Sequence, residues 1–309
     1  MRGPVLVVAV ALLGSVACSD GGTPSSDSAT TTRRPASSST AEPAPLTVVA
    51  VGDIATCDGT DDEAVAELVG TLRGDVLLLG DIAYPNGTPE QFEECFEPAW
   101  GNLRDRLRPA PGNHDFHTED GAGYFGWFGE AAGEPGKGWY SFDVGPWHVL
   151  ALNSNCAAVG GCGAGAEQER WLREALAASK ARCTLAFWHH ARFSSGSVHG
   201  SDATTADLWR ALADAGADVV LAGHEHVYER FAPMDAGGRV DPGRGIRSFV
   251  VGTGGRSHYG FGVPRAGSEV RDATTFGVLE LTLSEDRYRW RFVPVPGDTF
   301  TDKGQGRCH

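Results

Sequence analysis

Short apolar runs, each ending at a polar residue, alternate with longer amphipathic segments along most of the chain. The short runs have the length and composition of buried strands, and they cover residues 47–52, 75–80, 184–188, 218–222 and 248–251. The longer segments place apolar residues at helical spacing, and they cover residues 61–72, 88–100, 166–179 and 203–215. This alternation predicts an α/β domain that contains parallel βαβ units.

Two other patterns modify this picture. Alternating polar and apolar positions at 139–144, 147–153 and 276–295 predict antiparallel strands added to the parallel ones. Residues 121–136 are rich in glycine and aromatic side chains, so we expect a loop there. Its aromatic residues would either line a site or form a small core.

Polar side chains that can bind metals follow five of the apolar segments. One such ending is an ordinary turn, but five in one domain indicate a shared site, because ligands gather beyond the carboxyl ends of parallel strands. Their carboxylate, imidazole, amide and phenol groups suit a hard or borderline metal, and they outnumber the ligands of one tetrahedral ion. These residues are Asp53, Asp81 with Tyr84, Asn113 with His114, His189 with His190, and His224 with His226.

The order of these motifs resembles the calcineurin-like metallophosphoesterase superfamily, and within it the purple acid phosphatases. The motifs are Gly52-Asp53, Gly80-Asp81-x-x-Tyr84, Gly112-Asn113-His114-Asp115, the strand-end His189 and Gly223-His224-x-His226. Most of the superfamily carries Asp-x-His at the first motif, where this chain has Asp53-Ile54-Ala55; purple acid phosphatases supply a tyrosine from the second motif instead, which here is Tyr84. The resemblance implies a four-layer α/β/β/α sandwich with mixed sheets.

The resemblance also implies a role for each donor residue. Fe(III) would be held by Asp53, Asp81, Tyr84 and His226. A divalent ion, Zn, Mn or Fe, would be held by Asp81, Asn113, His189 and His224, with Asp81 bridging both ions. His190 would support the site without binding a metal, and His114 and His199 would contact the substrate or protonate its leaving group.

The implied function is a dinuclear phosphohydrolase, foremost a phosphomonoesterase of the acid phosphatase type, in which metal-bound hydroxide attacks phosphorus in line. A phosphodiesterase or nucleotidase with the same metals is the first alternative, and a non-catalytic surface binding module is the second. Lys and Arg number 26 and Asp and Glu 40, giving a net charge of −14. That balance argues against a nucleic-acid scaffold, and it does not exclude a small phosphate ester held by a local site. The sequence does not predict an oligomeric state.

The N-terminus predicts export. Arg2 and the apolar run that follows it resemble a signal peptide over residues 1–17, and this run is too short to span a bilayer. Cys18 resembles a lipidation site, although ordinary signal cleavage would suit the same position. Residues 18–45 have the composition of a flexible linker, which leaves residues 46–309 as the metallophosphoesterase domain. We therefore expect a cell-envelope lipoprotein or a secreted protein, with membrane contact through a lipid anchor only.

Six cysteines besides Cys18 suit three disulfides in an exported chain, although six allow about 15 connectivities. Cys156 and Cys162 flank a glycine-rich turn and are expected to pair. The remaining hypotheses are Cys57 with Cys95 and Cys183 with Cys308.

Overall fold

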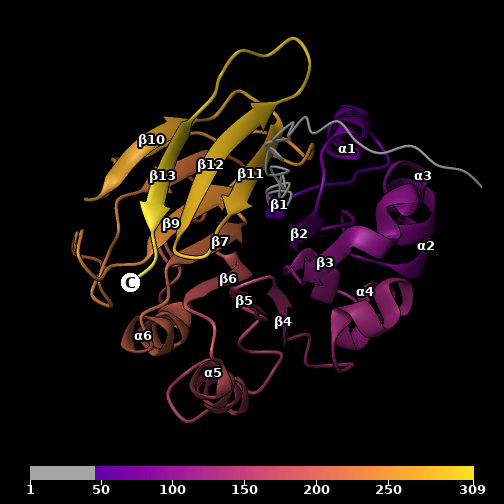
Figure 1. Cartoon of the computed structure of the whole chain (residues 1–309). Coiled ribbons are helices and arrows are strands. Elements are labelled where there is room, and N and C mark those ends of the chain that lie inside the picture. The colour runs from indigo at the N-terminus through magenta and orange to yellow at the C-terminus, as the bar shows by residue number, and fades with distance from the viewer. Residues whose placement is uncertain (1–45) are drawn as a thin grey trace, which may run out of the picture. The chain divides into compact units, whose positions relative to one another are not determined.

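The computed structural model describes residues 46–309, which build two mixed β-sheets (Figure 1). The first sheet has six strands in the spatial order β13 (Lys303–Arg307), β12 (Arg287–Pro294), β11 (Gly277–Leu283), β1 (Leu46–Val51), β2 (Asp75–Leu79) and β3 (Leu107–Ala110). The second has seven in the order β10 (Ser268–Asp272), β8 (Tyr228–Phe231), β9 (Arg247–Val251), β7 (Val219–Gly223), β6 (Cys183–His190), β5 (Trp147–Ala151) and β4 (Tyr140–Val144). The predicted signal peptide, Cys18 and linker lie outside the described residues.

The first sheet has its parallel strands on one side and its antiparallel strands on the other, whereas the second sheet has parallel strands at its centre and antiparallel pairs at both edges. In the first sheet β1, β2 and β3 are parallel, whereas β11 runs antiparallel to β1. In the second sheet β5, β6, β7 and β9 are parallel, and β4, β8 and β10 are antiparallel additions. All parallel strands therefore present their carboxyl ends at one edge of each sheet.

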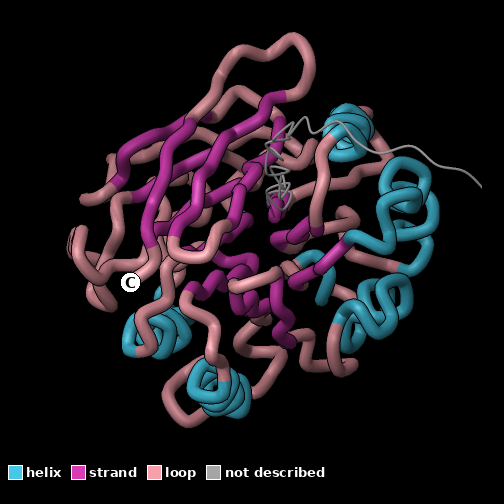
Figure 2. Tube along the Cα trace, viewed as in Figure 1, coloured by secondary structure: helices cyan, strands magenta, loops and turns pink. Residues whose placement is uncertain are grey.

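Helices cover the outer faces of the parallel parts of the two sheets, and in Figure 2 they lie to the right of and below the strands. Against the first sheet pack α1 (Asp61–Thr71), a π-helical turn (Phe92–Phe96), α3 (Glu97–Trp100) and α4 (Ala122–Phe128). The short helix α2 (Pro89–Gln91) precedes the π-helical turn and lies against that turn and α4. Against the second pack α5 (Glu167–Ala178) and α6 (Ala206–Asp214). The order helix, sheet, sheet, helix confirms the predicted four-layer α/β/β/α sandwich.

The largest buried cluster lies between the two sheets. It joins Leu77 and Leu79 of β2 to Leu185 and Phe187 of β6, all fully buried. Two further clusters fill the spaces between each sheet and its helices. Because both faces of the central strands are buried, these strands read as continuous apolar runs in the sequence.

The expectation of a loop over residues 121–136 is wrong for its first half, where α4 forms. Tyr124 and Phe128 of this helix are buried and pack with Phe92 and Phe96. The contact with that cluster outweighs the weak helix propensity of the glycines. These aromatic residues therefore form core and do not line a site.

The structure contains three disulfides, Cys57–Cys95, Cys156–Cys162 and Cys183–Cys308, each of which the sequence hypothesis named.

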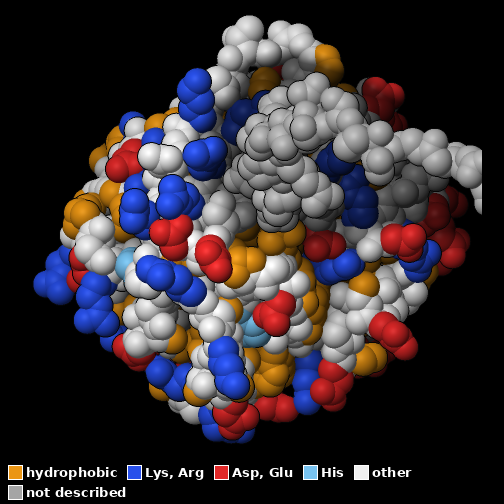
Figure 3. All heavy atoms as spheres, in the orientation of Figure 1, with side chains coloured by type: hydrophobic (Ala, Val, Ile, Leu, Met, Phe, Trp, Pro, Cys, Tyr) orange, Lys and Arg blue, Asp and Glu red, His pale blue; other side chains and the backbone are white. Residues whose placement is uncertain are grey.

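Arg287, Arg289 and Arg291 alternate along β12 and face outward, and Figure 3 shows Lys and Arg side chains gathered over β12 and β13. Among residues 46–309, no helix is long and apolar enough to cross a membrane.

Candidate metal centre

The carboxyl ends of the central strands of both sheets meet at one place. The backbone N–H of Gly52, after β1, donates to Val251 O at the end of β9, with an N···O distance of 2.9 Å. His189 Nδ1 of β6 lies 2.8 Å from Leu79 O at the end of β2. The residues that follow these strands therefore face a common space.

The first group of donor atoms surrounds the hydroxyl of Tyr84. This oxygen lies 3.1 Å from Asp53 Oδ1, 3.0 Å from Asp81 Oδ2 and 3.2 Å from His226 Nε2. His226 Nε2 is also 3.3 Å from Asp53 Oδ1. Four residues from three motifs thus point their polar atoms at one spot, and all four are buried.

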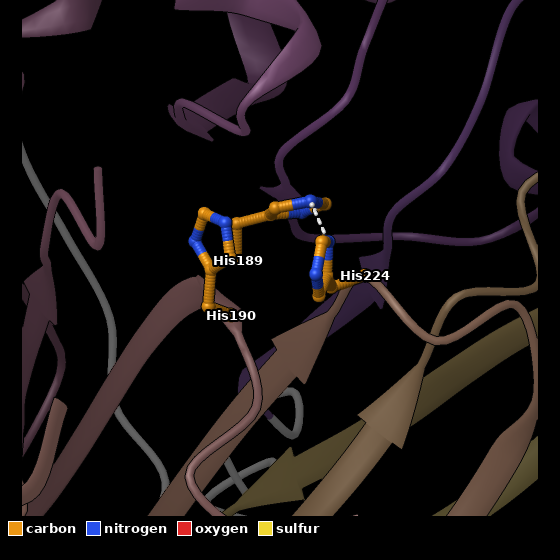
Figure 4. Close-up of side chains that lie close together, drawn as sticks. All are labelled: His189, His190 and His224. Carbon is orange, nitrogen blue, oxygen red and sulfur yellow. Dashed lines mark hydrogen bonds between the residues drawn. The ribbon is translucent and has the colours of Figure 1, made fainter. Parts of the chain in front are cut away.

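The second group surrounds Nε2 of His189. This nitrogen lies 3.2 Å from Asp81 Oδ2, 3.2 Å from Asn113 Oδ1 and 3.0 Å from His224 Nδ1. Figure 4 shows the contact between His189 and His224. Oδ2 of Asp81 belongs to both groups, so this carboxylate is shared between them.

Unusual backbone conformations place three of these donors. Asp53, Asp81 and His224 have positive φ values of 62°, 52° and 73°. Residues other than glycine rarely adopt this backbone region, and each such residue raises the free energy of the folded state by on the order of 1 kcal/mol or more. Gly223 leaves room for the Asp53 carboxylate, because a Cβ at position 223 would lie only 2.7 Å from Asp53 Oδ2.

Hydrogen bonds from neighbouring groups fix the donors' orientation. Asp53 Oδ2 accepts from the backbone N–H of His224 at 2.9 Å, and Asp81 Oδ1 accepts from that of His114 at 2.8 Å. Ser257 Oγ lies 2.8 Å from His226 Nδ1, as Leu79 O does from His189 Nδ1. When these second nitrogens carry the ring proton, Nε2 of both rings presents a lone pair to the centre, as a metal-binding imidazole does.

The donor groups fit metal ions. Two ligand atoms that each lie about 2.1 Å from one ion, at a right angle, are about 3 Å apart, which matches the 3.0–3.3 Å spacings within both groups. Burial, Asp81 and Asp53 raise the pKa of the Tyr84 phenol well above its usual value. Cations between these groups would offset that repulsion and allow the phenol to lose its proton.

The structure brings together all seven predicted metal ligands, and it places both predicted catalytic histidines beside them. The His114 ring centroid is 4.4 Å from that of Tyr84, and the His199 ring centroid is 4.0 Å from that of His224. His190, expected as a supporting residue, bonds through Nδ1 to Ser154 Oγ at 2.7 Å. Burial and the neighbouring His189 lower the pKa of His190 to about 4.

The segment after β9 contributes residues that the motifs did not identify. The Arg256 guanidinium lies over the Tyr84 ring, 5.0 Å from its centroid, and its backbone N–H donates to Asp53 O at 3.1 Å. Tyr259 stacks on His226, with centroids 3.9 Å apart and planes 9° apart. Gly252, Gly254 and Gly255 let the chain pass close to the centre. This glycine-rich turn is the only feature of the sequence that points to a contribution from this segment.

A comparison with known families agrees with this geometry. The profile described as calcineurin-like phosphoesterase matches residues 46–228, more than half of the chain. The chain belongs to the calcineurin-like phosphoesterase family. Within this family it is similar to "Purple acid phosphatase 15" of Arabidopsis thaliana, with 27% identity over 222 residues that make up 60% of this chain and 41% of that protein. The chain therefore spans about two fifths of the length of this relative.

Solved structures of the family share the fold. The purple acid phosphatase PPD1 of yellow lupin (Lupinus luteus) seeds matches with a TM-score of 0.69 and 20% identity, over 84% of this chain and 53% of that chain. GAP50, described as the anchor in the inner membrane complex of Plasmodium, matches with a TM-score of 0.59 and 17% identity, over 84% of this chain and 88% of that chain. At these identities the match concerns the fold alone.

Proposed function

We propose that this member of the calcineurin-like phosphoesterase family is a dinuclear phosphohydrolase that acts foremost on phosphomonoesters. One observation carries the proposal: seven donor residues from five strand ends form two groups of atoms that share the Asp81 carboxylate. One ion would not need so many donors, whereas two ions bridged by a carboxylate use them all.

The two groups differ in chemistry, and this supports different metals. The group of Asp53, Asp81, Tyr84 and His226 would hold Fe(III), because a phenolate and two carboxylates are hard, anionic ligands. The group of Asp81, Asn113, His189 and His224 would hold Zn, Mn or Fe(II). When bound, the two ions would supply Lewis acidity that stabilises negative charge on the reacting phosphoryl group and its attacking oxygen.

The chain's own residues complete a site for a phosphate ester. Arg256 is exposed, and its guanidinium has no hydrogen bond or ion pair within residues 46–309, so it is free to bind phosphoryl oxygens. His114 lies on the Tyr84 side of the centre and would contact the same phosphoryl group. His199 lies on the His224 side and would donate a proton to the leaving oxygen.

The two alternatives predict different behaviour. A phosphodiesterase with the same metals would turn over a bis ester as well as a monoester. A binding module would bind without turnover, and GAP50, which shares the fold, is described as an anchor. The complete donor set of this chain favours the hydrolase.

We also propose export, with a lipid anchor at Cys18 or free secretion. The three disulfides support this, because such bonds persist in oxidising compartments.

Metal analysis and kinetics on the pure protein test the function. We expect two ions per chain and a higher kcat/KM on p-nitrophenyl phosphate than on bis(p-nitrophenyl) phosphate. Asp81→Asn should lower the metal content, because the shared ligand loses its charge. It should also lower the activity by at least roughly 100-fold. Glu280→Gln, at a half-buried position on β11 where the side chain pairs with Arg291 and contacts none of the donor residues, serves as the control. One ion per chain, or equal or better turnover of the bis ester, would overturn the proposal.

A further inference from the structure

One buried carboxylate connects the metal-centre motif to the loop that carries His199. Glu225 lies between His224 and His226 and is fully buried. Its Oε1 accepts hydrogen bonds from the backbone N–H groups of His199 and Gly200. Its Oε2 has no hydrogen-bond partner within residues 46–309. Within residues 46–309, these two amide groups are therefore the contacts that offset the cost of burying this carboxylate.

The same loop, residues 194–201, is held from its other sides. The backbone N–H of Ser195 donates to Glu229 Oε2 at 2.7 Å, and that of Ser197 donates to Gly260 O at 3.0 Å. Gly196 packs so closely on the Glu225 carboxylate that a Cβ at this position would collide with it. The backbone on both sides of His199 thus has a defined position, although His199 itself is exposed.

This arrangement decides where the imidazole of His199 lies. Its ring centroid is 4.0 Å from that of His224 and 5.7 Å from that of Tyr259. No side-chain hydrogen bond of His199 is found in the described part of the chain, so the ring depends on its backbone for placement. The Glu225 carboxylate supplies two bonds to that backbone, one at His199 and one at the next residue.

We propose that Glu225 is a positioning residue that holds His199 where it can protonate the leaving oxygen of an alkyl phosphate. The inference rests on the proposed function. In the step concerned, water oxygen forms a bond to phosphorus as the bond from phosphorus to the leaving oxygen breaks. Both electrons of the broken bond stay on the leaving oxygen, which takes a proton from His199 and departs as an alcohol. The proton lost by water returns through solvent to His199, so the enzyme is restored.

The chemical class of substrate follows from this step. An alkoxide is a strong base and leaves poorly without a proton, whereas p-nitrophenolate is stable enough to leave unaided. A fixed proton donor is therefore worth most for phosphomonoesters of alcohols. Such esters are the substrates that depend on Glu225.

The experiment compares 2-phenylethyl phosphate with p-nitrophenyl phosphate on metal-loaded protein. We expect His199→Ala to lower kcat/KM for the alkyl ester by roughly 10²–10⁴-fold and for the aryl ester much less. Glu225→Val should shift the aryl-to-alkyl ratio the same way by at least roughly tenfold, with metal content unchanged. Glu225→Gln keeps an acceptor oxygen and should restore most of the alkyl activity. Glu280→Val is the matched control on β11, where it removes a carboxylate that pairs with Arg291, and it should leave the ratio unchanged.

One further measurement and one further variant make the outcome decisive. Amide hydrogen exchange of the 194–201 segment should accelerate in Glu225→Val and remain slow in Glu225→Gln. Where Glu225→Val does not fold, Glu225→Asp replaces it, because a carboxylate shortened by one methylene cannot keep both bonds, and the same change in ratio is expected.

Equal losses on both esters, or slow exchange in a variant that lacks both bonds, would overturn the role of Glu225. Failure of the proposed function is a separate result. It would appear as no turnover of either ester by the metal-loaded wild-type protein, before any variant is compared.

Discussion

The phenol oxygen of Tyr84 lies 3.1 Å from Oδ1 of Asp53, a residue 31 positions earlier in the chain that follows a different strand. The first motif lacks the histidine at position 55 that most of the superfamily carries, and Ala55 stands there instead. The tyrosine of the second motif fills the space beside Asp53. In the proposed metal site, Tyr84 would thus supply a donor beside Asp53 where position 55 has none.

The proposed Fe(III) ligand gives a visible prediction. We expect the loaded protein to show a phenolate-to-Fe(III) absorption band in the visible range, and Tyr84→Phe to lose this band while two metals stay bound. Tyr259→Phe is the matched control and should keep the band, because the Tyr259 ring stacks on His226 while its hydroxyl contacts none of the proposed ligands. An absorption spectrum with metal analysis on each variant checks this. A colourless wild type with two zinc or manganese ions would contradict the iron assignment and leave the hydrolase proposal standing.

Arg256 provides a second prediction, on substrate binding. Arg256→Ala should raise KM for a phosphomonoester by roughly 10- to 100-fold, because a hydrogen-bonded contact to a charged group is worth about 1.5–3 kcal/mol. Since the contact is made in the ground state as well as in the transition state, kcat should change little. Arg256→Lys should recover part of the loss, as a point charge without the two-pronged geometry.

Steady-state kinetics and the inhibition constant of inorganic phosphate measure this effect. Arg289→Ala removes an outward-facing arginine of β12 and serves as the control for net charge. An unchanged KM and phosphate affinity in Arg256→Ala would exclude this residue from substrate binding.

The donors of the site were predictable because each lies at or within a few residues of the end of an apolar run. Asp53, Asp81 and His224 could be aligned from the sequence since parallel strands end at one edge. Arg256 could not, because it belongs to no motif and reaches Tyr84 only through the turn after β9. The role of Glu225 was also hidden, since its partners are backbone amides of residues 199 and 200 in another loop.

The same contrast holds for the fold. The central strands are buried on both faces, so their composition alone predicted them. The helix α4 was missed because its stability comes from contacts of Tyr124 and Phe128 with distant aromatic residues. Strand β8 and the edge strands β10 and β13 were not identified either, because these short segments carry several polar residues.

A buried acid away from the metal centre predicts a dependence of stability on pH. Asp62 in the first turn of α1 is 2% exposed, and its Oδ2 has no hydrogen-bond partner within residues 46–309. Burial, with a contribution from Glu63, raises the pKa of the Asp62 carboxyl from 3.8 to about 7. Between these values the folded protein keeps a proton that the unfolded chain has released, so the free energy of unfolding should fall as pH rises from about 4 to about 7.

Asp62→Asn should remove this contribution, because an amide does not titrate. Between pH 4.5 and pH 7 the melting temperature of the variant should therefore fall less, or rise more, than that of the wild type. Asp61→Asn, at the exposed neighbouring position, is the control and should behave like the wild type. Parallel pH profiles of wild type and Asp62→Asn would contradict the raised pKa.

Two of the disulfides should differ in their contribution to stability because they close loops of different length. Cys183–Cys308 spans 125 positions and Cys156–Cys162 spans 6. Loop-closure entropy in the unfolded chain then gives about 5 kcal/mol for the first and about 2 kcal/mol for the second. Replacing both cysteines of each pair by alanine and comparing free energies of unfolding in urea measures the two values, and the short-loop variant is the control for losing two sulfur atoms. Equal losses in both variants would show that local packing, and not constraint of the unfolded chain, sets the effect of these bonds.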